Sequence, residues 1–226
     1  ARIIDIKSPE ILTRDKVPVA VEAVATVKVA NSSEEILKAA ERFLGKTEEE
    51  INENIKKVLE GHTCEVIAKT SLRQLLHDRE SVVSEFNKIA ASDLFKLGLF
   101  VDAYTIKDIL DVRGIIKQIL SNININFTKD YDTKDYNKVK VETNLIFKVE
   151  VIPDFVQNFG NFTLEQRDDF LKTLVYKVIS KKLKSITQKE IQEQIDDKLS
   201  LDLISAIDEE VKSLGLKVVK GLFIIV

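Results

Sequence analysis

The sequence is poor in the residues that carry reactive or covalent chemistry. Its 226 residues include one cysteine, two histidines and seven glycines, and no methionine. A lone cysteine excludes an internal disulfide framework, so Cys64 is interpreted as a small apolar residue of the core. The absence of methionine, including a starting one, favours a piece of a longer protein.

Long apolar runs and an excess of one charge are also lacking. The longest uncharged apolar run is far shorter than the roughly 18 residues of a membrane-spanning helix, and no signal segment opens the chain. The net charge is −3. Without the basic excess typical of nucleic-acid binding, no nucleic-acid partner is predicted. With 44% hydrophobic and 31% charged residues, the composition is that of a soluble globular chain.

Motifs of catalysis are absent as well. The sequence has no GxSxG, no glycine-rich phosphate loop and no HExxH. His62 and Cys64 stand in "GHTCE" and His77 lies 15 residues beyond His62, which offers fewer convergent ligands than a metal site needs. The acidic stretches "TEEEINEN" and "HDRESVVSE" are interpreted as solvated helix faces and first-turn charges. We therefore predict no enzymatic activity, no catalytic residue, no cofactor and no metal ion.

What the sequence does contain is an internal repeat. "LTRDKVPVAVEAVATVKV", residues 12–29, recurs as "DTKDYNKVKVETNLIFKV", residues 132–149. Laid over each other without a gap, the two stretches are identical at the positions of Thr13, Asp15, Val19, Val21, Glu22, Lys28 and Val29. A chain of this length holds one large domain or two of about 110 residues, and the repeat favours two.

The first unit is predicted to begin with an antiparallel hairpin. Residues 2–12 and 17–29 alternate apolar and polar side chains with the period of two that is typical of half-buried strands, and the polar turn "TRDK" lies between them. "LFVDAYTI" is predicted as a further strand. Helices are predicted where a capping box or helical spacing occurs, namely after Ser32 with Glu35, after Thr47 with Glu50, and from about Asp78 to Leu97.

The second unit repeats this order. Strands are predicted around "ININF", "KVKVETNLIFKVEV" and "LKVVKGLFIIV". Helices are predicted at a short segment ending at Gly160, from Thr163 with Gln166 to about Ile179, from Thr187 with Glu190, and from Leu201 to Leu214. The core-facing positions of the second strand of each hairpin are predicted to include Val19, Val21, Val27, Val139, Val141 and Phe147.

The segment between the two units is predicted to be helical. From Asp108 to Leu120, apolar residues recur with helical spacing, which indicates a connecting helix over residues 112–122. The predicted fold class is therefore α+β, with two units at residues 1–111 and 123–226. Each unit is expected to be a small antiparallel-rich sheet with helices packed on one face.

Three stretches of the first unit carry a family resemblance. "SPEILTRDKVPVAVEAVATVKV", "AAERFLGKTEEEINENIKKVLEGH" and "AASDLFKLGLFVDAYTIKDI" occur in this order. Together they resemble the SPFH domain of the Band 7 family (stomatin, prohibitin and flotillin), and among its branches are most like the flotillins. The resemblance covers roughly residues 4–111. The second unit matches in pattern and hairpin only, as a divergent SPFH-like repeat, where a flotillin is expected to continue as a long coiled coil.

The resemblance implies a non-enzymatic, membrane-associated scaffold that oligomerises through its SPFH-like units into rings or cages. Self-association is then expected, with the membrane surface reached through segments outside this chain and the side of the membrane left open. The alternative is a soluble protein-binding or regulatory module that contacts a membrane protease or a motor component. An open sheet edge must be covered, charged or paired with another chain. The resemblance implies pairing with another chain and therefore favours the scaffold. Charge patches at residues 78–97 and 177–198 either steer neighbouring copies together or serve solubility.

Overall fold

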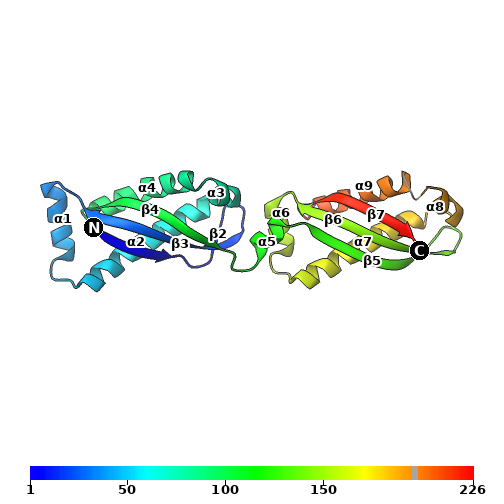
Figure 1. Ribbon diagram of the computed structural model, residues 1–226, viewed down its shortest axis with the longest axis horizontal. Helices are drawn as coiled ribbons and strands as arrows, with labels where there is room; N and C mark the ends of the chain where they lie inside the picture. The colour runs from blue at the N-terminus through cyan, green and yellow to red at the C-terminus, as the bar shows by residue number, and fades with distance from the viewer. Residues whose placement is uncertain (195–197) are drawn as a thin grey trace. The chain divides into compact units, whose positions relative to one another are not determined.

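The computed structural model describes residues 1–194 and 198–226 (Figure 1), and the chain forms two compact units, Ala1–Gly114 and Ile115–Val226. In each unit, helices cover one face of an antiparallel sheet (Figure 1). This arrangement confirms the predicted α+β class. Its physical basis is the alternation of apolar and polar residues along the strands, which gives each sheet one face that must be covered.

The sheet of the first unit is built around β3 (Pro18–Val29). β1 (Arg2–Lys7) and β4 (Leu99–Leu110) pair antiparallel with the same part of β3, so they lie on its two sides. The short β2 (Ile11–Leu12) pairs with the beginning of β3. β1 and β4 therefore form the outer edges of this sheet.

Most helices of the first unit begin where the sequence predicts. They are α1 (Ser33–Phe43), α2 (Glu48–Lys69), α3 (Leu72–His77) and α4 (Arg79–Lys96). The side chains of Ser32 and Thr47 accept hydrogen bonds from backbone N–H groups three residues on, and complete the predicted capping boxes. The sequence analysis did not predict α3, although Ser71 and Gln74 form a third capping box. Asp78 caps α4.

The second unit holds a sheet in the order β5 (Ile123–Asp132), β6 (Lys138–Val149) and β7 (Leu216–Ile225). Its helices are α5 (Ile115–Leu120), α6 (Ile152–Phe159), α7 (Leu164–Leu183), α8 (Gln188–Gln194) and α9 (Lys198–Lys212). α7 extends beyond its predicted end at Ile179 because Leu183 continues the buried stripe of this helix.

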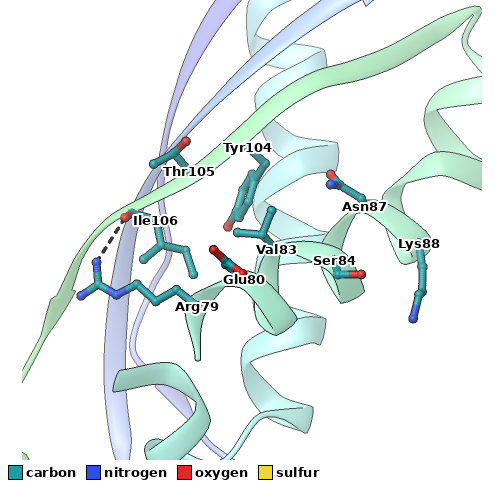
Figure 2. Close-up of a pocket in the computed structure, with 9 residues that line it drawn as sticks. All are labelled: Arg79, Glu80, Val83, Ser84, Asn87, Lys88, Tyr104, Thr105 and Ile106. Atoms are coloured by element: carbon teal, nitrogen blue, oxygen red, sulfur yellow. Dashed lines mark hydrogen bonds between the residues drawn. The ribbon is translucent and has the colours of Figure 1, made fainter. Parts of the chain in front are cut away.

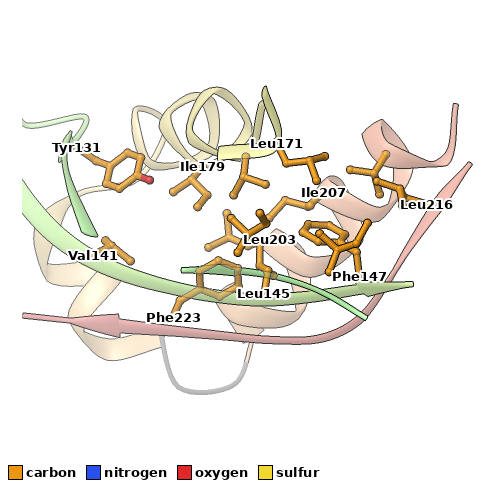
Figure 3. Close-up of a cluster of buried hydrophobic side chains, with 14 of the residues drawn as sticks. Tyr131, Val141, Leu145, Phe147, Leu171, Ile179, Leu203, Ile207, Leu216 and Phe223 are labelled. Atoms are coloured by element: carbon orange, nitrogen blue, oxygen red, sulfur yellow. The ribbon is translucent and has the colours of Figure 1, made fainter. Parts of the chain in front are cut away.

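The core of the second unit lies between its sheet and the helices α7 and α9 (Figure 3). Phe147 of β6 and Phe223 of β7 point from the sheet toward Leu171 of α7 and Ile207 of α9 (Figure 3). The strand positions predicted to face the two cores are each at most 3% exposed: Val19, Val21, Val27, Val139, Val141 and Phe147. The predicted inner faces of β3 and β6 are therefore confirmed.

The predicted connecting helix is wrong at its start. Residues 108–110 pair with β3 and belong to β4, and the helix α5 covers only Ile115–Leu120. Gly114, with a φ of +69°, adopts the left-handed conformation that breaks regular structure before α5. Apolar spacing over a few residues does not separate a helix from a strand. The backbone of residues 108–110 gains ladder partners in the sheet, whereas a short isolated helix is marginal.

The repeated threonines build the same turn in both units. The backbone N–H of Thr13 and that of Thr133 each donate to the carbonyl four residues later at 2.9 Å. Each threonine hydroxyl also accepts a hydrogen bond from the N–H of that later residue, at 3.1 Å and 3.2 Å respectively. Lys16 and Tyr136 occupy the left-handed position of the turn, with φ of 66° and 62°. The turns of the two hairpins are thus constructed alike.

The repeated aspartates tie each turn to the start of a helix. Asp15 accepts a hydrogen bond from the backbone N–H of Leu72, the first residue of α3, at 2.9 Å. Asp135 accepts one from Gln188, the first residue of α8, at 3.2 Å. A carboxylate suits a helix N-terminus, where N–H groups lack partners and the helix dipole is positive. The repeat therefore has a structural cause, since both copies fasten a hairpin turn to a helix.

We expect the Asp135 contact to weaken in acid. Hydrogen bonds from Thr133, from backbone N–H groups and from Asn137 hold the pKa of Asp135 below its ordinary value. Because the folded-state pKa is lowered, this contribution to stability is present above the ordinary aspartate pKa of about 3.9 and is lost as the pH falls through the lowered value. Asp135→Asn should therefore lower the free energy of unfolding more at pH 7 than at pH 3, as measured by urea titration.

Asp132→Asn is the matched control for this prediction, because Asp132 is an exposed carboxylate at the end of β5, just before the same turn. It should change the free energy of unfolding little at either pH. An equal loss at pH 7 and pH 3 for Asp135→Asn would show that charge at this position does not stabilise the turn.

The last strand of each unit begins after a glycine with positive φ. Gly98 precedes β4 with a φ of +70°, and Gly215 precedes β7 with a φ of +74°. Their carbonyls accept hydrogen bonds from the N–H of Ala30 at 3.0 Å and of Glu150 at 2.8 Å. Each glycine therefore closes a helix and joins the last strand of its unit to the end of the central one.

Candidate functional site

The few metal-ligand candidates of the sequence do not converge. Nε2 of His62 lies 3.5 Å from Oδ2 of Asp93, and its Nδ1 lies 4.0 Å from Oε2 of Glu65. His77 is exposed at the end of α3. Cys64 is half-buried rather than enclosed, and burial raises the pKa of its thiol. Within the described residues, no group of three or more histidine, cysteine, aspartate or glutamate side chains could hold a metal ion.

A groove of about 750 Å³ runs between α4 and β4 in the first unit (Figure 2). One wall is helical and polar, and the other is the outer strand of the sheet. The lining residues are Arg79, Glu80, Val83, Ser84, Asn87 and Lys88 of α4 with Tyr104, Thr105 and Ile106 of β4. Tyr104 and Ile106 are buried residues of β4, so the groove rests on the core of the unit.

The floor of the groove is held by a stacked pair of rings. The ring of Tyr104 stacks on Phe86 of α4, with centroids 3.7 Å apart and planes 13° apart. The Tyr104 hydroxyl lies 3.1 Å from Oγ1 of Thr63 on α2. Burial raises the pKa of Tyr104, so its hydroxyl stays protonated at neutral pH. The floor is therefore apolar, uncharged and fixed by contacts to two helices.

β4 presents an unpaired backbone edge along the groove. The carbonyl of Ile106 accepts a hydrogen bond from Nη1 of Arg79 at 3.4 Å (Figure 2), so this carbonyl points away from β3. Backbone groups of successive residues point alternately to the two sides of an antiparallel strand. Tyr104, two residues earlier in the same register, therefore directs its N–H and C=O to the free edge as well. Among the described strands, β4 pairs with β3 alone.

Opposite charges mark the two ends of this edge. The stretch Ala103–Ile106 carries no charge and stands between Asp102 and Lys107. Oδ2 of Asp102 lies 2.6 Å from Nζ of Lys28, and Nζ of Lys107 lies 2.7 Å from Oδ1 of Asp5. Both are exposed surface pairs of the kind that contributes about 0–1 kcal/mol. They leave an uncharged centre with a negative and a positive end.

Chemically, the groove can accept an extended chain. It offers unpaired strand backbone, an apolar floor and a polar helical wall, which is the combination used where a strand or peptide adds to a sheet edge. The sequence analysis predicted an uncovered edge but did not find this groove. The uncharged "AYTI" between Asp102 and Lys107 is a signal in the sequence that could have indicated it.

The charged helix surfaces form ion pairs that face solvent. In α4, Lys96 lies 2.7 Å from Asp93, and between α7 and α9 Lys182 lies 3.0 Å from Asp202. The acidic end of the charge patch at residues 177–198 includes residues 195–197, which lie outside the described residues. Within the part that the structure describes, no helix is both long enough and apolar enough to span a membrane.

Comparison with known proteins assigns the groove-bearing unit to a family. Residues 1–119 match the model of the SPFH domain / Band 7 family. The chain is 34% identical over 116 residues to the flotillin-like protein FloT of Bacillus subtilis. It is 35% identical over 117 residues to flotillin-1 of Drosophila melanogaster and 38% identical over 109 residues to human flotillin-1.

These matches cover about half of the chain and a smaller part of each relative. They span 51%, 51% and 48% of this chain, but only 23%, 28% and 26% of the respective relatives. The family match contains the whole first unit, with the hairpin, its turn and the β4–α4 groove. The chain belongs to the SPFH domain / Band 7 family, and its relatives within that family are flotillins.

Proposed function

We propose that the protein is a membrane-associated scaffold that oligomerises through SPFH-like units into rings or cages. The observation that carries this proposal is membership of the SPFH domain / Band 7 family, with flotillins as relatives. Copies of the protein would associate with one another to form the assembly, and the assembly would lie at a membrane surface. The matched residues span about a quarter of the relatives' length. We propose that the membrane surface is reached through segments outside this chain.

We further propose that residues 123–226 form a second, divergent SPFH-like unit after a first unit at residues 1–111, with residues 112–122 between them. The shared turns and the glycines before the last strand of each unit support this reading. So does an irregularity common to both sheets, because the register shifts after residue 26 in the β3–β4 pair and after residue 146 in the β6–β7 pair, although the β3–β4 pair has a further shift after residue 22. These two positions are 120 residues apart, the same separation as that of the repeated turns.

The outer strands of both sheets support the assembly step. β1 and β4 flank the first sheet, and β5 and β7 flank the second. Each has one side without a strand partner among the described residues. An edge of this kind is either blunted or paired with another chain, and pairing side by side would join copies without unfolding any of them.

We propose that this role is non-enzymatic. The groove between α4 and β4 is lined by one serine and no histidine or cysteine. A nucleophile needs an activating base within hydrogen-bond reach, and the groove holds no such pair. Its polar residues are therefore assigned to binding rather than to turnover.

The alternative is a protein-binding or regulatory module that holds a membrane protease or a motor component. The shape of the β4–α4 groove favours this reading, because strand addition beside a helix also serves peptide recognition. The module would remain monomeric and bind one partner, whereas the scaffold would associate with copies of itself.

The experiment is a concentration series of the full-length protein with and without lipid vesicles of phosphatidylcholine and phosphatidylserine. Light scattering and vesicle co-sedimentation report mass and membrane contact together. The scaffold predicts assemblies that grow with protein concentration and co-sediment with vesicles. If the protein stays monomeric and remains in the supernatant at high concentration, the scaffold is rejected and the binding module is favoured.

A further inference from the structure

We propose that two copies of the chain pair through the free edge of β4, as antiparallel neighbours related by a two-fold axis. The occupant of the β4–α4 groove is then the edge of a second copy. This inference rests on the proposed function, because it names one contact through which copies of the scaffold pair. A closed two-fold contact joins copies only in pairs, so rings or cages need a second, different contact. A two-fold contact uses the same surface on both copies, so that surface must be complementary to itself.

The backbone of β4 meets the first requirement of such a contact. Tyr104 and Ile106 direct their N–H and C=O groups to the free side, whereas Thr105 directs its groups to β3. A second antiparallel strand would pair with these outward groups. Near the end of the edge, the N–H of Ile109 donates to Oδ1 of Asp108 at 2.8 Å. At its centre, the outward carbonyl of Ile106 accepts a hydrogen bond from Arg79, and at 3.4 Å that bond is long. Little is lost when the partner strand replaces it.

The charges of β4 are complementary to their own two-fold image. Asp102 lies before the uncharged centre and Lys107 lies after it. An antiparallel pair brings the beginning of one strand beside the end of the other, so Asp102 of one copy approaches Lys107 of the second copy at both ends of the contact. Asp102 and Lys107 already lie on the open face with Lys28 and Asp5. The contact would therefore extend two surface ion pairs into a longer row of alternating charge.

The helical wall of the groove does not oppose this orientation. Arg79 and Glu80 line one end of the wall and Lys88 lines the other, with Ser84 between them. A two-fold axis near the centre of β4 turns the second α4 end for end, so Glu80 of one copy approaches Lys88 of the other. Because Arg79 lies at the same end as Glu80, that end carries both signs. The direction of pairing is therefore set by the charges of β4 rather than by those of α4.

The centre of the edge is small enough for close approach. Ala103 and Thr105 are exposed and project to the open face of the sheet, opposite to the buried Tyr104 and Ile106. Neither carries a charge that would blunt the edge. The other outer strand of this sheet, β1, instead alternates Asp5 and Lys7 on its exposed face. It offers a matched control edge in the same unit.

The first test is disulfide trapping in a Cys64→Ser background of the full 226-residue chain. Opposed residues that are not hydrogen-bonded to each other have Cα atoms about 4.5 Å apart, within the range that a disulfide closes. Thr105→Cys alone traps a pair centred on Thr105. A mixture of Thr105→Cys with Ala103→Cys traps a pair centred on Tyr104. One of these samples should yield a dimer on mild oxidation, and Ile3→Cys on β1, where Ile3 is 73% exposed, should yield none.

The second test uses charge reversal across the axis. Thr105→Glu and Thr105→Lys each place like charges close to their own image, and each should raise the dimer dissociation constant at least about tenfold. An equimolar mixture of the two variants should restore wild-type association, because the mixed pair opposes unlike charges. Ile3→Glu and Ile3→Lys are the controls and should associate as the wild type does. Circular dichroism establishes that each exposed substitution leaves the fold intact.

The outcomes separate this inference from the proposed function. Assemblies that persist unchanged in both Thr105 variants, with no disulfide trapped on β4, overturn the β4 pairing and leave the scaffold standing. Loss of association without restoration in the mixture shows that β4 meets a different strand, which also overturns the two-fold contact. A wild-type chain that remains monomeric at every concentration and traps no dimer overturns the inference and removes the support that self-association gives to the scaffold.

Discussion

Replacing Gly215 by alanine should lower the free energy of unfolding of the second unit by about 2–5 kcal/mol. Gly215 has a φ of +74°, and a Cβ at this position would lie 2.3 Å from the carbonyl oxygen of Val151 and 2.5 Å from the backbone nitrogen of Phe155. Both atoms belong to backbone and cannot rotate away. The left-handed conformation costs about 1–2 kcal/mol for an L-residue, and forced displacement in a packed region adds about 1–3 kcal/mol.

Gly45→Ala is the control for this result. Gly45 also has a positive φ, of +83°, but a Cβ there would meet nothing within 4 Å. Its substitution should cost about 1–2 kcal/mol, from backbone conformation alone. Urea titrations followed by circular dichroism measure both variants. Equal losses at Gly45 and Gly215 would show that the contact with α6 does not set the cost.

Phe147→Ala should destabilise the second unit by about 3–5 kcal/mol. Phe147 is fully buried on β6 and points into the core between the sheet and its helices (Figure 3). Truncation removes the apolar contacts of the ring and leaves a cavity that the surrounding strands and helices fill only in part. The loss should appear as a lower urea midpoint for the second unit with an unchanged slope.

Leu222→Ala tests whether the effect depends on the face of the sheet. Leu222 lies on the neighbouring β7, is 50% exposed and precedes the buried Phe223. Its truncation should change the free energy of unfolding by less than about 1 kcal/mol. A loss below about 1 kcal/mol for Phe147→Ala, or a larger one for Leu222→Ala, would contradict the assigned faces, because a one-residue slip exchanges them.

The local structure of this protein was readable from its sequence because its causes are local. A period of two identified the inner faces of β3 and β6 down to Val21 and Val141, since successive side chains of a strand alternate between faces. Pairs such as Thr47 with Glu50 located helix starts, since the partners of a capping box are three residues apart. The repeat around Thr13 and Thr133 likewise predicts two similar hairpins, since each copy places the same residues in its turn.

Only the tertiary structure shows what the repeated aspartates do, which is to accept a hydrogen bond from the first residue of a helix. Asp15 binds the N–H of Leu72, and the two residues are 57 positions apart in the chain. No spacing rule joins a turn to a helix start at that distance, because the pairing depends on where the fold places the start of α3. The sequence revealed that Asp15 and Asp135 recur, and the fold supplied the reason.

The same division holds for the segment after β4 and for the groove. Helical spacing from Asp108 onward was overridden by pairing with β3, since ladder hydrogen bonds to a distant strand outweigh a short apolar pattern. The sequence also marked Ala103–Ile106 as uncharged, but an uncharged strand is equally suited to the middle of a sheet. Only the pairing of β1 and β4 on opposite sides of β3 makes this stretch an edge, because strand order arises from contacts between residues far apart in the chain.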